Sequence, residues 1–205
     1  MSEIYDNGER YDLDREMRKQ NDKAYEEHIS AHKKAKSIAF AGKAGSGKTT
    51  LAKHLEMQGY QRLSFADPMR EIVQLIYPGI DKSDPRYREL MQKLGTDWFR
   101  SFDEDVWLNI LMRRVGDNPV VVDDVRFPNE VQALYNAGFV VFFLECPEEV
   151  RVMRILERDG FVNKATVDHK SETSLDDFRP NWLNVVNSDM ALNKFLERFD
   201  GMLKS

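Results

Sequence analysis

Residues 42–49 read G-K-A-G-S-G-K-T and complete the pattern G-x-x-x-x-G-K-S/T. In such a loop the glycines let backbone N–H groups turn inward around phosphate oxygens, and the N-terminus of the following helix adds partial positive charge. Lys48 is placed to reach the outer phosphates, and the Thr49 hydroxyl to join the shell of a magnesium ion. The sequence therefore predicts a nucleoside triphosphate site with contacts from Gly42, Ala44, Gly45, Ser46, Gly47, Lys48, Thr49 and Thr50.

Polar side chains also follow two other apolar segments. Asp67 and Arg70 come after residues 61–65, and three charged groups follow residues 119–122. Ligands of open parallel sheets bind beyond the carboxyl ends of the strands, so these positions are candidate substrate contacts. We expect Asp124 to hold magnesium or a substrate group and Arg126 to clamp a phosphate with two donors. Asp123 has two open interpretations, a structural hydrogen bond or helix cap and a functional carboxylate.

Three arginines recur at three- and four-residue spacing on one face of a helix predicted at 147–158. Because phosphoryl transfer spreads negative charge over the transferred group, we expect Arg154 and Arg158, ahead of Arg151, to act in catalysis. The alternative is a solvated helix face paired with neighbouring glutamates. The polar loop at 159–171 completes a predicted lid around residues 151–172, which would exclude water from the reaction.

The elements that must position these residues alternate along the chain. Short apolar runs predict strands at 37–41, 61–65, 119–122, 139–144 and 182–186. Helical spacing follows the phosphate loop and recurs at 66–76, 85–94, 103–115, 128–138, 147–158 and 189–203. Apolar strands separated by helices indicate a parallel sheet covered on both faces. The predicted fold class is therefore α/β, a three-layer P-loop NTPase fold with a five-stranded parallel sheet.

The composition restricts the class of protein. The chain has 205 residues, 30 of them basic and 35 acidic, and the formal charge of −5 argues against general nucleic-acid binding. A single cysteine, Cys146, predicts a buried structural thiol and a cytoplasmic protein without disulfides. No apolar stretch approaches the roughly 20 residues of a membrane-spanning helix, so no membrane association is expected.

Residues 1–36 differ in composition from residues 37–205. They contain no valine, few aliphatic residues and a dense mixture of charges, so they cannot bury enough apolar area to fold alone. The prediction is a charged N-terminal arm, flexible or helical, ahead of one P-loop kinase domain. Leu13, Met17 and Tyr25 offer a thin apolar stripe, and an arm that tethers the domain to a partner is the alternative.

Four blocks of the sequence resemble a phage-type deoxynucleoside monophosphate kinase. They are the loop at 42–49, R-E-L-M-Q-K-L-G-T-D at 88–97, V-V-D-D-V-R-F-P-N-E at 121–130, and D-H-K-S-E at 168–172. The block at 88–97 is the most specific, since a generic phosphate-loop protein has no need of it. The resemblance covers about residues 37–203 and leaves the N-terminal arm outside.

The resemblance implies transfer of the γ-phosphoryl group of ATP, with Mg²⁺, to a deoxynucleoside 5′-monophosphate. It implies a nucleoside-monophosphate-kinase-like fold, a homodimer among its assemblies, and a host-cytoplasmic location if the protein is phage-encoded. By position, Lys48 and Thr49 match residues that handle ATP and magnesium, and Asp124 and Arg126 match a substrate-binding acid–arginine pair. With the helix arginines argued above, the predicted catalytic residues are Lys48, Arg126, Arg154 and Arg158. The predicted metal contacts are Thr49 and Asp124, while the choice of carboxylate among Asp67, Asp123 and Asp124 stays open. The substrate-binding set is Asp67, Arg70, Trp107, Asp124, Arg126, His169 and Glu172.

Within that set, Trp107 matches an aromatic residue that would stack on the nucleotide base, and a core aromatic is its alternative. Two departures from the family bear on base preference. The segment between Ile76 and Pro85 is short where some relatives carry a long insertion, and Asp123 adds a second acid.

The implied reaction needs no general base, because the attacking phosphate oxygen is already anionic near neutral pH. Two rival functions stay open at this point. One is a P-loop kinase of another small acceptor, such as dephospho-coenzyme A or a sugar acid. The other is a nucleotide-hydrolysing switch or ATPase, although the N-K-x-D guanine motif of a GTPase is absent.

Overall fold

The computed structural model describes residues 4–6, 9–11, 36–81, 84–160 and 170–204. The chain divides into two compact units, Met1–Ala35 and Lys36–Ser205. In the first unit, β1 (Ile4–Asp6) and β2 (Glu9–Tyr11) form an antiparallel hairpin. The sequence interpretation of residues 1–36 as a flexible or helical arm did not anticipate this hairpin, and most of that arm lies outside the described residues.

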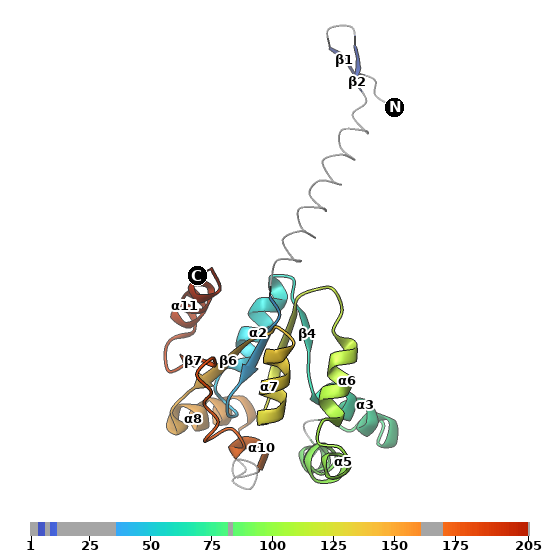
Figure 1. The fold of residues 1–205 in the computed structure, drawn as a ribbon, viewed down its shortest axis with the longest axis vertical. Helices are drawn as coiled ribbons and strands as arrows, with labels where there is room; N and C mark the ends of the chain where they lie inside the picture. Colours follow the sequence, from blue (N-terminus) through green and yellow to red (C-terminus); the bar gives the residue numbers. More distant parts are fainter. Residues whose placement is uncertain (1–3, 7–8, 12–35, 82–83, 161–169, 205) are drawn as a thin grey trace. The chain divides into compact units, whose positions relative to one another are not determined.

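The second unit is built on a parallel sheet in the order β4-β5-β3-β6-β7 (Figure 1). Its strands are β3 (Ile38–Ala41), β4 (Gln61–Leu63), β5 (Val120–Val125), β6 (Val140–Glu145) and β7 (Asn184–Asn187). The central strand β3 is fully buried, as expected for a parallel sheet covered on both faces. The predicted fold class, α/β with a five-stranded parallel sheet, is confirmed.

Helices follow the strands in the order expected from the sequence. They are α2 (Lys48–Met57), α3 (Ala66–Ile76), α4 (Pro85–Gln92), α5 (Phe99–Phe102), α6 (Val106–Arg114), α7 (Pro128–Asn136), α8 (Glu148–Asp159), α10 (Lys170–Thr173) and α11 (Leu192–Lys204). No helix in the described ranges is long and apolar enough to cross a membrane.

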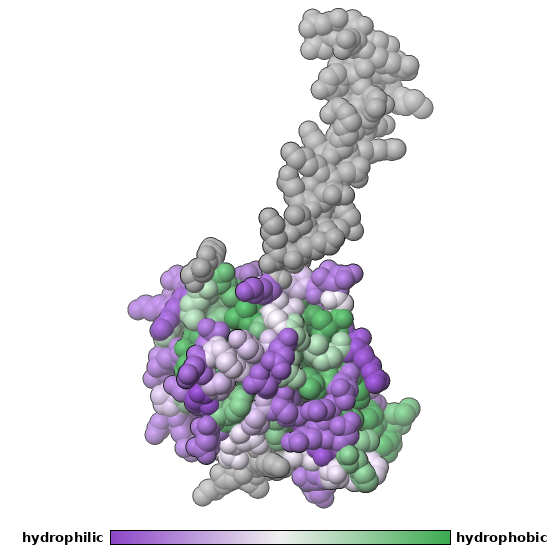
Figure 2. All heavy atoms as spheres, in the orientation of Figure 1, coloured by the Kyte–Doolittle hydropathy of each residue, from purple (hydrophilic) through white to green (hydrophobic). Residues whose placement is uncertain are grey.

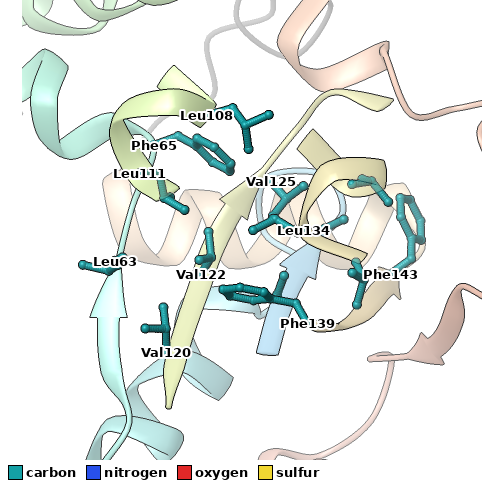
Figure 3. Close-up of a cluster of buried hydrophobic side chains, with 14 of the residues drawn as sticks. Leu63, Phe65, Leu108, Leu111, Val120, Val122, Val125, Leu134, Phe139 and Phe143 are labelled. Carbon is teal, nitrogen blue, oxygen red and sulfur yellow. The ribbon is translucent and has the colours of Figure 1, made fainter. Parts of the chain in front are cut away.

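The alternation of side chains along β5 divides the core into two layers. Val120 and Val122 face a cluster that includes Leu108 and Leu111 of α6 and Leu134 of α7, which Figure 3 shows. Val121 faces the opposite layer, where α2 and α11 supply the apolar side chains. Burial of these side chains between the sheet and its helices fixes where the strands end, and therefore where the functional side chains begin.

One predicted helix end was wrong. The sequence placed the end of the helix that starts after Asp84 at Gly95, but the chain continues through a π-helix, η1 (Lys93–Trp98), into α5. Gly95 is buried, its carbonyl accepts the Trp107 indole N–H at 2.7 Å, and a Cβ there would clash with the Met69 sulfur. Gly95 thus lies in close packing against Met69 within a continuing helix rather than at a helix terminus, and π-helical turns are frequent at functional sites.

Several apolar side chains are exposed on α3, η1 and α5. Leu75 and Ile76 near the end of α3, Trp98 in η1 and Phe102 in α5 are all more than half exposed. Figure 2 shows apolar atoms on the side of the molecule where α3 and α5 lie.

Candidate active site

The phosphate loop connects β3 to α2. Two of its glycines are favoured both by their backbone conformation and by the lack of space for a side chain. Gly42 and Gly45 have positive φ angles of 128° and 82°. A Cβ on Gly42 would lie 2.6 Å from the Leu144 carbonyl oxygen, and one on Gly45 would lie 2.7 Å from the Arg151 carbonyl oxygen. At these two positions the loop therefore lies against β6 and α8 too closely for any side chain.

Lys48 is the first residue of α2, and its ammonium group points back into the loop. The side chain is buried, with Nζ 2.5 Å from the Gly42 carbonyl oxygen and 2.8 Å from that of Lys43. Burial, followed by the nearby Arg126 guanidinium, lowers the pKa of Lys48 to about 8. The Lys48 ammonium group thus donates to backbone carbonyl oxygens of the loop itself.

Thr49 contacts a carboxylate at the end of the neighbouring strand. Its hydroxyl donates to Asp123 Oδ2 at 2.8 Å. Arg62 of β4 holds the same carboxylate with two donors, Nε to Oδ1 at 3.1 Å and a terminal nitrogen to Oδ2 at 2.7 Å. Sequence reasoning missed Arg62, because nothing in a single arginine on an edge strand signals a partner 61 residues away.

Asp124 makes different contacts from the neighbouring Asp123. Its carboxylate accepts hydrogen bonds from the Ser64 hydroxyl at 2.6 Å and from the backbone N–H groups of Phe65 and Ala66 at 3.0 Å each. These amides belong to the start of α3, so Asp124 acts as a cap across the sheet. Burial raises the pKa of Asp124. The sequence paired Thr49 with Asp124 for metal binding, whereas the structure brings Thr49 to Asp123.

Arg126 and Glu172 form an ion pair that reaches the phosphate loop. An Arg126 guanidinium nitrogen contacts Glu172 Oε1, and Glu172 Oε2 accepts the Ala44 backbone N–H at 2.8 Å. The Glu172 side chain is only 4% exposed. Burial alone would raise the pKa of Glu172, but Arg126 and the Ala44 N–H hold it below its usual value. Both residues belong to the predicted substrate-binding set, and the structure does bring them together.

A cavity of about 180 Å³ opens beside this ion pair. Its aromatic and thioether walls come from α3, α4, α6 and the start of α7, and its polar groups from η1, α5, β5 and α10. The lining residues are Phe65, Ala66, Met69, Met91, Gln92, Gly95, Thr96, Arg100, Trp107, Asp124, Arg126, Phe127, Glu130 and Glu172. The cavity lies beyond the carboxyl end of β5, as expected for a ligand site of a parallel sheet.

A second buried ion pair lies at the cavity and was not predicted. Arg100 contacts Glu130 Oε1, and Arg100 Cζ lies 4.1 Å from the centroid of the Phe127 ring. Glu130 Oε2 also accepts the backbone N–H groups of Arg126 at 2.8 Å and Phe127 at 3.1 Å. Burial raises the pKa of Glu130 to about 7, against the effect of Arg100. A glutamate three positions into a helix is a capping signal, so Glu130 could have been found from the sequence.

Of the three arginines of α8, two contact the phosphate loop and one does not. Arg151 donates to the Ala44 carbonyl at 3.3 Å, and Arg154 to the carbonyls of Gly45 at 3.4 Å and Ser188 at 2.9 Å. Arg158 instead pairs with its neighbour Asp159, and its side chain is 60% exposed. The structure therefore brings Arg154 to the loop, together with Arg151, which the sequence ranked lower, while Arg158 points away from it.

The other predicted substrate contacts lie apart from the cavity or in its wall. Asp67 and Arg70 pair with each other at the start of α3 and do not line the cavity. Trp107 is 1% exposed, and its indole N–H is taken by Gly95. This geometry matches the core-aromatic interpretation of Trp107 more closely than base stacking. His169 lies outside the described residues.

Fold and loop together define a P-loop protein with an α/β fold. The chain belongs to the AAA domain family, whose model matches residues 38–174, more than half of its length. That match spans the phosphate loop, the strand β5 and the ion pair of Arg126 with Glu172. No curated protein sequence matches the chain significantly.

Solved structures share the fold at low identity. A shikimate kinase from Acinetobacter baumannii in complex with shikimate matches with a TM-score of 0.54 and 20% identity over 86% of this chain and 97% of its own. A gluconokinase from Sinorhizobium meliloti 1021 matches with a TM-score of 0.52 and 18% identity over 82% and 91%. TT1252 from Thermus thermophilus matches with a TM-score of 0.53 and 17% identity over 83% and 97%. Two of the three are named for other acceptors, as a shikimate kinase and a gluconokinase, so the resemblance to deoxynucleoside monophosphate kinases stays a prediction.

Proposed function

We propose that the protein is an ATP-dependent kinase that transfers the γ-phosphoryl group to a deoxynucleoside 5′-monophosphate. One observation carries the proposal: the phosphate loop and an arginine-containing cavity meet at Glu172, which contacts Ala44 of the loop and Arg126 of the cavity. An acceptor phosphate bound at Arg126 would lie next to the end of a triphosphate in the loop, as direct transfer requires. The kinase fold and the four sequence blocks support the same reaction.

Magnesium fits the chemistry of the groups at the start of α2. Mg²⁺ prefers oxygen ligands and is usually held by one or two protein oxygens together with phosphate oxygens and water. Thr49 and Asp123 offer a hydroxyl and a carboxylate 2.8 Å apart, and no described cluster of three or more His, Cys, Asp or Glu would hold a metal alone. Here Asp123, rather than the predicted Asp124, is the carboxylate beside Thr49. When bound, the ion would neutralise charge on the transferred phosphates.

The chain's own cations have separate tasks in this proposal. Lys48 leaves the loop carbonyls and binds the outer phosphates of ATP, while Arg126 orients the acceptor phosphate with two donors. Arg151 and Arg154 donate to the loop carbonyls and hold the loop in shape. No residue has to remove a proton, since the acceptor phosphate is already anionic.

The walls of the cavity suit a flat aromatic base. Phe65 and Phe127 present rings, and Met69 and Met91 present thioethers that adapt to a ligand. Phe127 is held from beneath by the Arg100 guanidinium, so its ring is a fixed surface against which a base can stack. We assign the stacking role to Phe127 and place Trp107 in the core, where its ring packs edge-on against Phe99. A homodimer and a cytoplasmic location stay predictions.

The test is ADP release from ATP and Mg²⁺ with each common deoxy- and ribonucleoside monophosphate, combined with direct detection of the diphosphate product. Diphosphates formed from some deoxynucleotides would establish the reaction. A second candidate, a kinase of another small acceptor such as a sugar acid, is favoured by the structural match to gluconokinase, so gluconate and shikimate belong in the same panel. Phosphorylation of either in place of the nucleotides would replace the proposed acceptor, and ADP without a phosphorylated product would indicate an ATPase.

A further inference from the structure

Glu172 of α10 joins both halves of the site. Its Oε2 accepts the Ala44 N–H, an amide of the phosphate loop, at 2.8 Å, and its Oε1 contacts the Arg126 guanidinium. In Figure 1, α10 lies near the ends of α7 and α8, the helices that flank the loop and the cavity. The carboxylate therefore binds a backbone donor of the phosphate loop and, at the same time, one of the two arginines that line the cavity.

A second acid holds the same segment on the loop. Asp176, three residues beyond α10, pairs with Lys43 at 2.8 Å. Lys43 and Ala44 are consecutive loop residues, so the segment 172–176 contacts the loop through two adjacent positions. The Lys43–Asp176 pair is partly exposed, and the Glu172 carboxylate is not. Glu172 is therefore the contact that a ligand in the loop would have to disturb.

A phosphate oxygen and a carboxylate oxygen compete for the same backbone N–H, because both are anionic acceptors. The two groups also repel each other at short distance, most strongly where water is excluded. We propose that Glu172 is an internal anion that occupies the phosphate-binding loop and holds Arg126 until ATP displaces it, so that ATP binding releases Arg126 for the acceptor. The second half of this proposal rests on the proposed function.

Two consequences follow from this competition. A ligand that binds only after Glu172 has left shows an affinity reduced by the fraction of molecules in the released state. Because ATP and the acceptor both favour the released state, each should bind more tightly in the presence of the other, and by the same factor. Removing the charge of Glu172 should then strengthen binding of each ligand alone and reduce this coupling.

The experiment is a calorimetric titration of the full chain with a non-hydrolysable ATP analogue and Mg²⁺, for wild type and Glu172→Gln. We expect the variant to bind the analogue roughly tenfold more tightly. The matched control is Asp177→Asn, which makes the same charge change at an exposed position of the same segment and should leave affinity unchanged. Glu172→Asp keeps the charge but shortens the reach, and its affinity should fall between wild type and Glu172→Gln.

The titrations are repeated with dTMP and dGMP, one pyrimidine and one purine, with and without the analogue. Coupling present in wild type and reduced in Glu172→Gln would support release of Arg126. If Glu172→Gln binds the analogue no more tightly than wild type, or more weakly, the carboxylate stabilises the binding conformation and the proposal is overturned. If neither nucleotide binds, the proposed function fails, while the analogue titration still decides the role of Glu172 at the loop.

Discussion

The phosphate loop and the acceptor cavity are built in opposite ways. The loop is eight consecutive residues between one strand and one helix, and its ligand groups are mostly backbone amides. The cavity collects side chains from eight elements between α3 and α10. Charge follows the same division: Lys48 is satisfied by carbonyls of its own loop, whereas Arg100 and Arg126 each need a carboxylate 30 or 46 residues away. A local motif can be recognised in a sequence, and a pocket assembled from distant elements cannot.

Removing the loop cation should have the largest effect on activity. Lys48→Ala is expected to lower phosphoryl transfer by about a thousandfold or more, since no other described group is placed to neutralise the outer phosphates from within the loop. The thermal unfolding midpoint should not fall, because a buried ammonium with a lowered pKa is costly to the folded state. Turnover and thermal melts of Lys48→Ala and of Lys53→Ala, an exposed lysine on the same helix, make the comparison. Near-normal turnover in Lys48→Ala would contradict the assignment of the loop.

On the cavity side, the largest effect should be on stability. Arg100→Met leaves the Glu130 carboxylate buried without its cation and should lower the free energy of unfolding by about 3–5 kcal/mol. Urea unfolding measures this loss. The pKa of Glu130 is raised, so its contribution to stability is present at low pH and lost as the pH rises through about 7. Removing Arg100 raises that pKa further, so the cost of the substitution should shrink as the pH falls below 7. A cost independent of pH would show that Arg100 acts through packing on Phe127 alone.

Substitution of Arg126 should affect the acceptor cavity much more than the phosphate loop. Arg126→Ala should raise the KM for the acceptor by roughly 10- to 100-fold and change ATP affinity much less, because the guanidinium faces the cavity. Arg126→Lys should rescue only in part, since a single ammonium cannot reproduce a planar two-donor fork. Steady-state kinetics with each substrate varied in turn decide the matter. Equal losses for ATP and acceptor would place Arg126 in the triphosphate site instead.

The two regions also differ in how far the sequence predicted them. The parallel sheet was predictable because apolar strands separated by helices indicate it, and the loop because its spacing is fixed by phosphate geometry. Thr49 was predicted as a magnesium contact, but the sequence could not choose its carboxylate partner, because Asp123 and Asp124 are adjacent in sequence and point to opposite sides of β5. Only the pleat of the strand in its sheet decides which acid meets the loop.

The π-helix η1 and the buried Arg100–Glu130 pair at the cavity were not predictable either, because both depend on contacts between distant elements. Gly95 carries a helix-ending signal in the sequence, and the contact that overrides it comes from Met69 and Trp107, which approach from α3 and α6. Arg100 and Arg158 are indistinguishable by residue type, yet one is buried on Glu130 and the other is exposed beside Asp159. Tertiary contacts, rather than local propensity, decide which arginine becomes part of a site.

The smallest expected effect is a proton taken up by the loop when ATP binds. Burial lowers the pKa of Lys48 to about 8, so the ammonium form is present below pH 8 and lost as the pH rises through that value. A triphosphate favours the charged form and raises the pKa, so binding at pH 9 should take up close to one proton and binding at pH 7 almost none. Titration calorimetry in buffers of different ionisation enthalpy measures this uptake. In Lys48→Arg the uptake should vanish because a guanidinium stays protonated throughout. Proton uptake that persists in Lys48→Arg would assign the proton to another group. Uptake in wild type alone would show that the proton binds to Lys48, whose pKa is lowered by its burial in the fold.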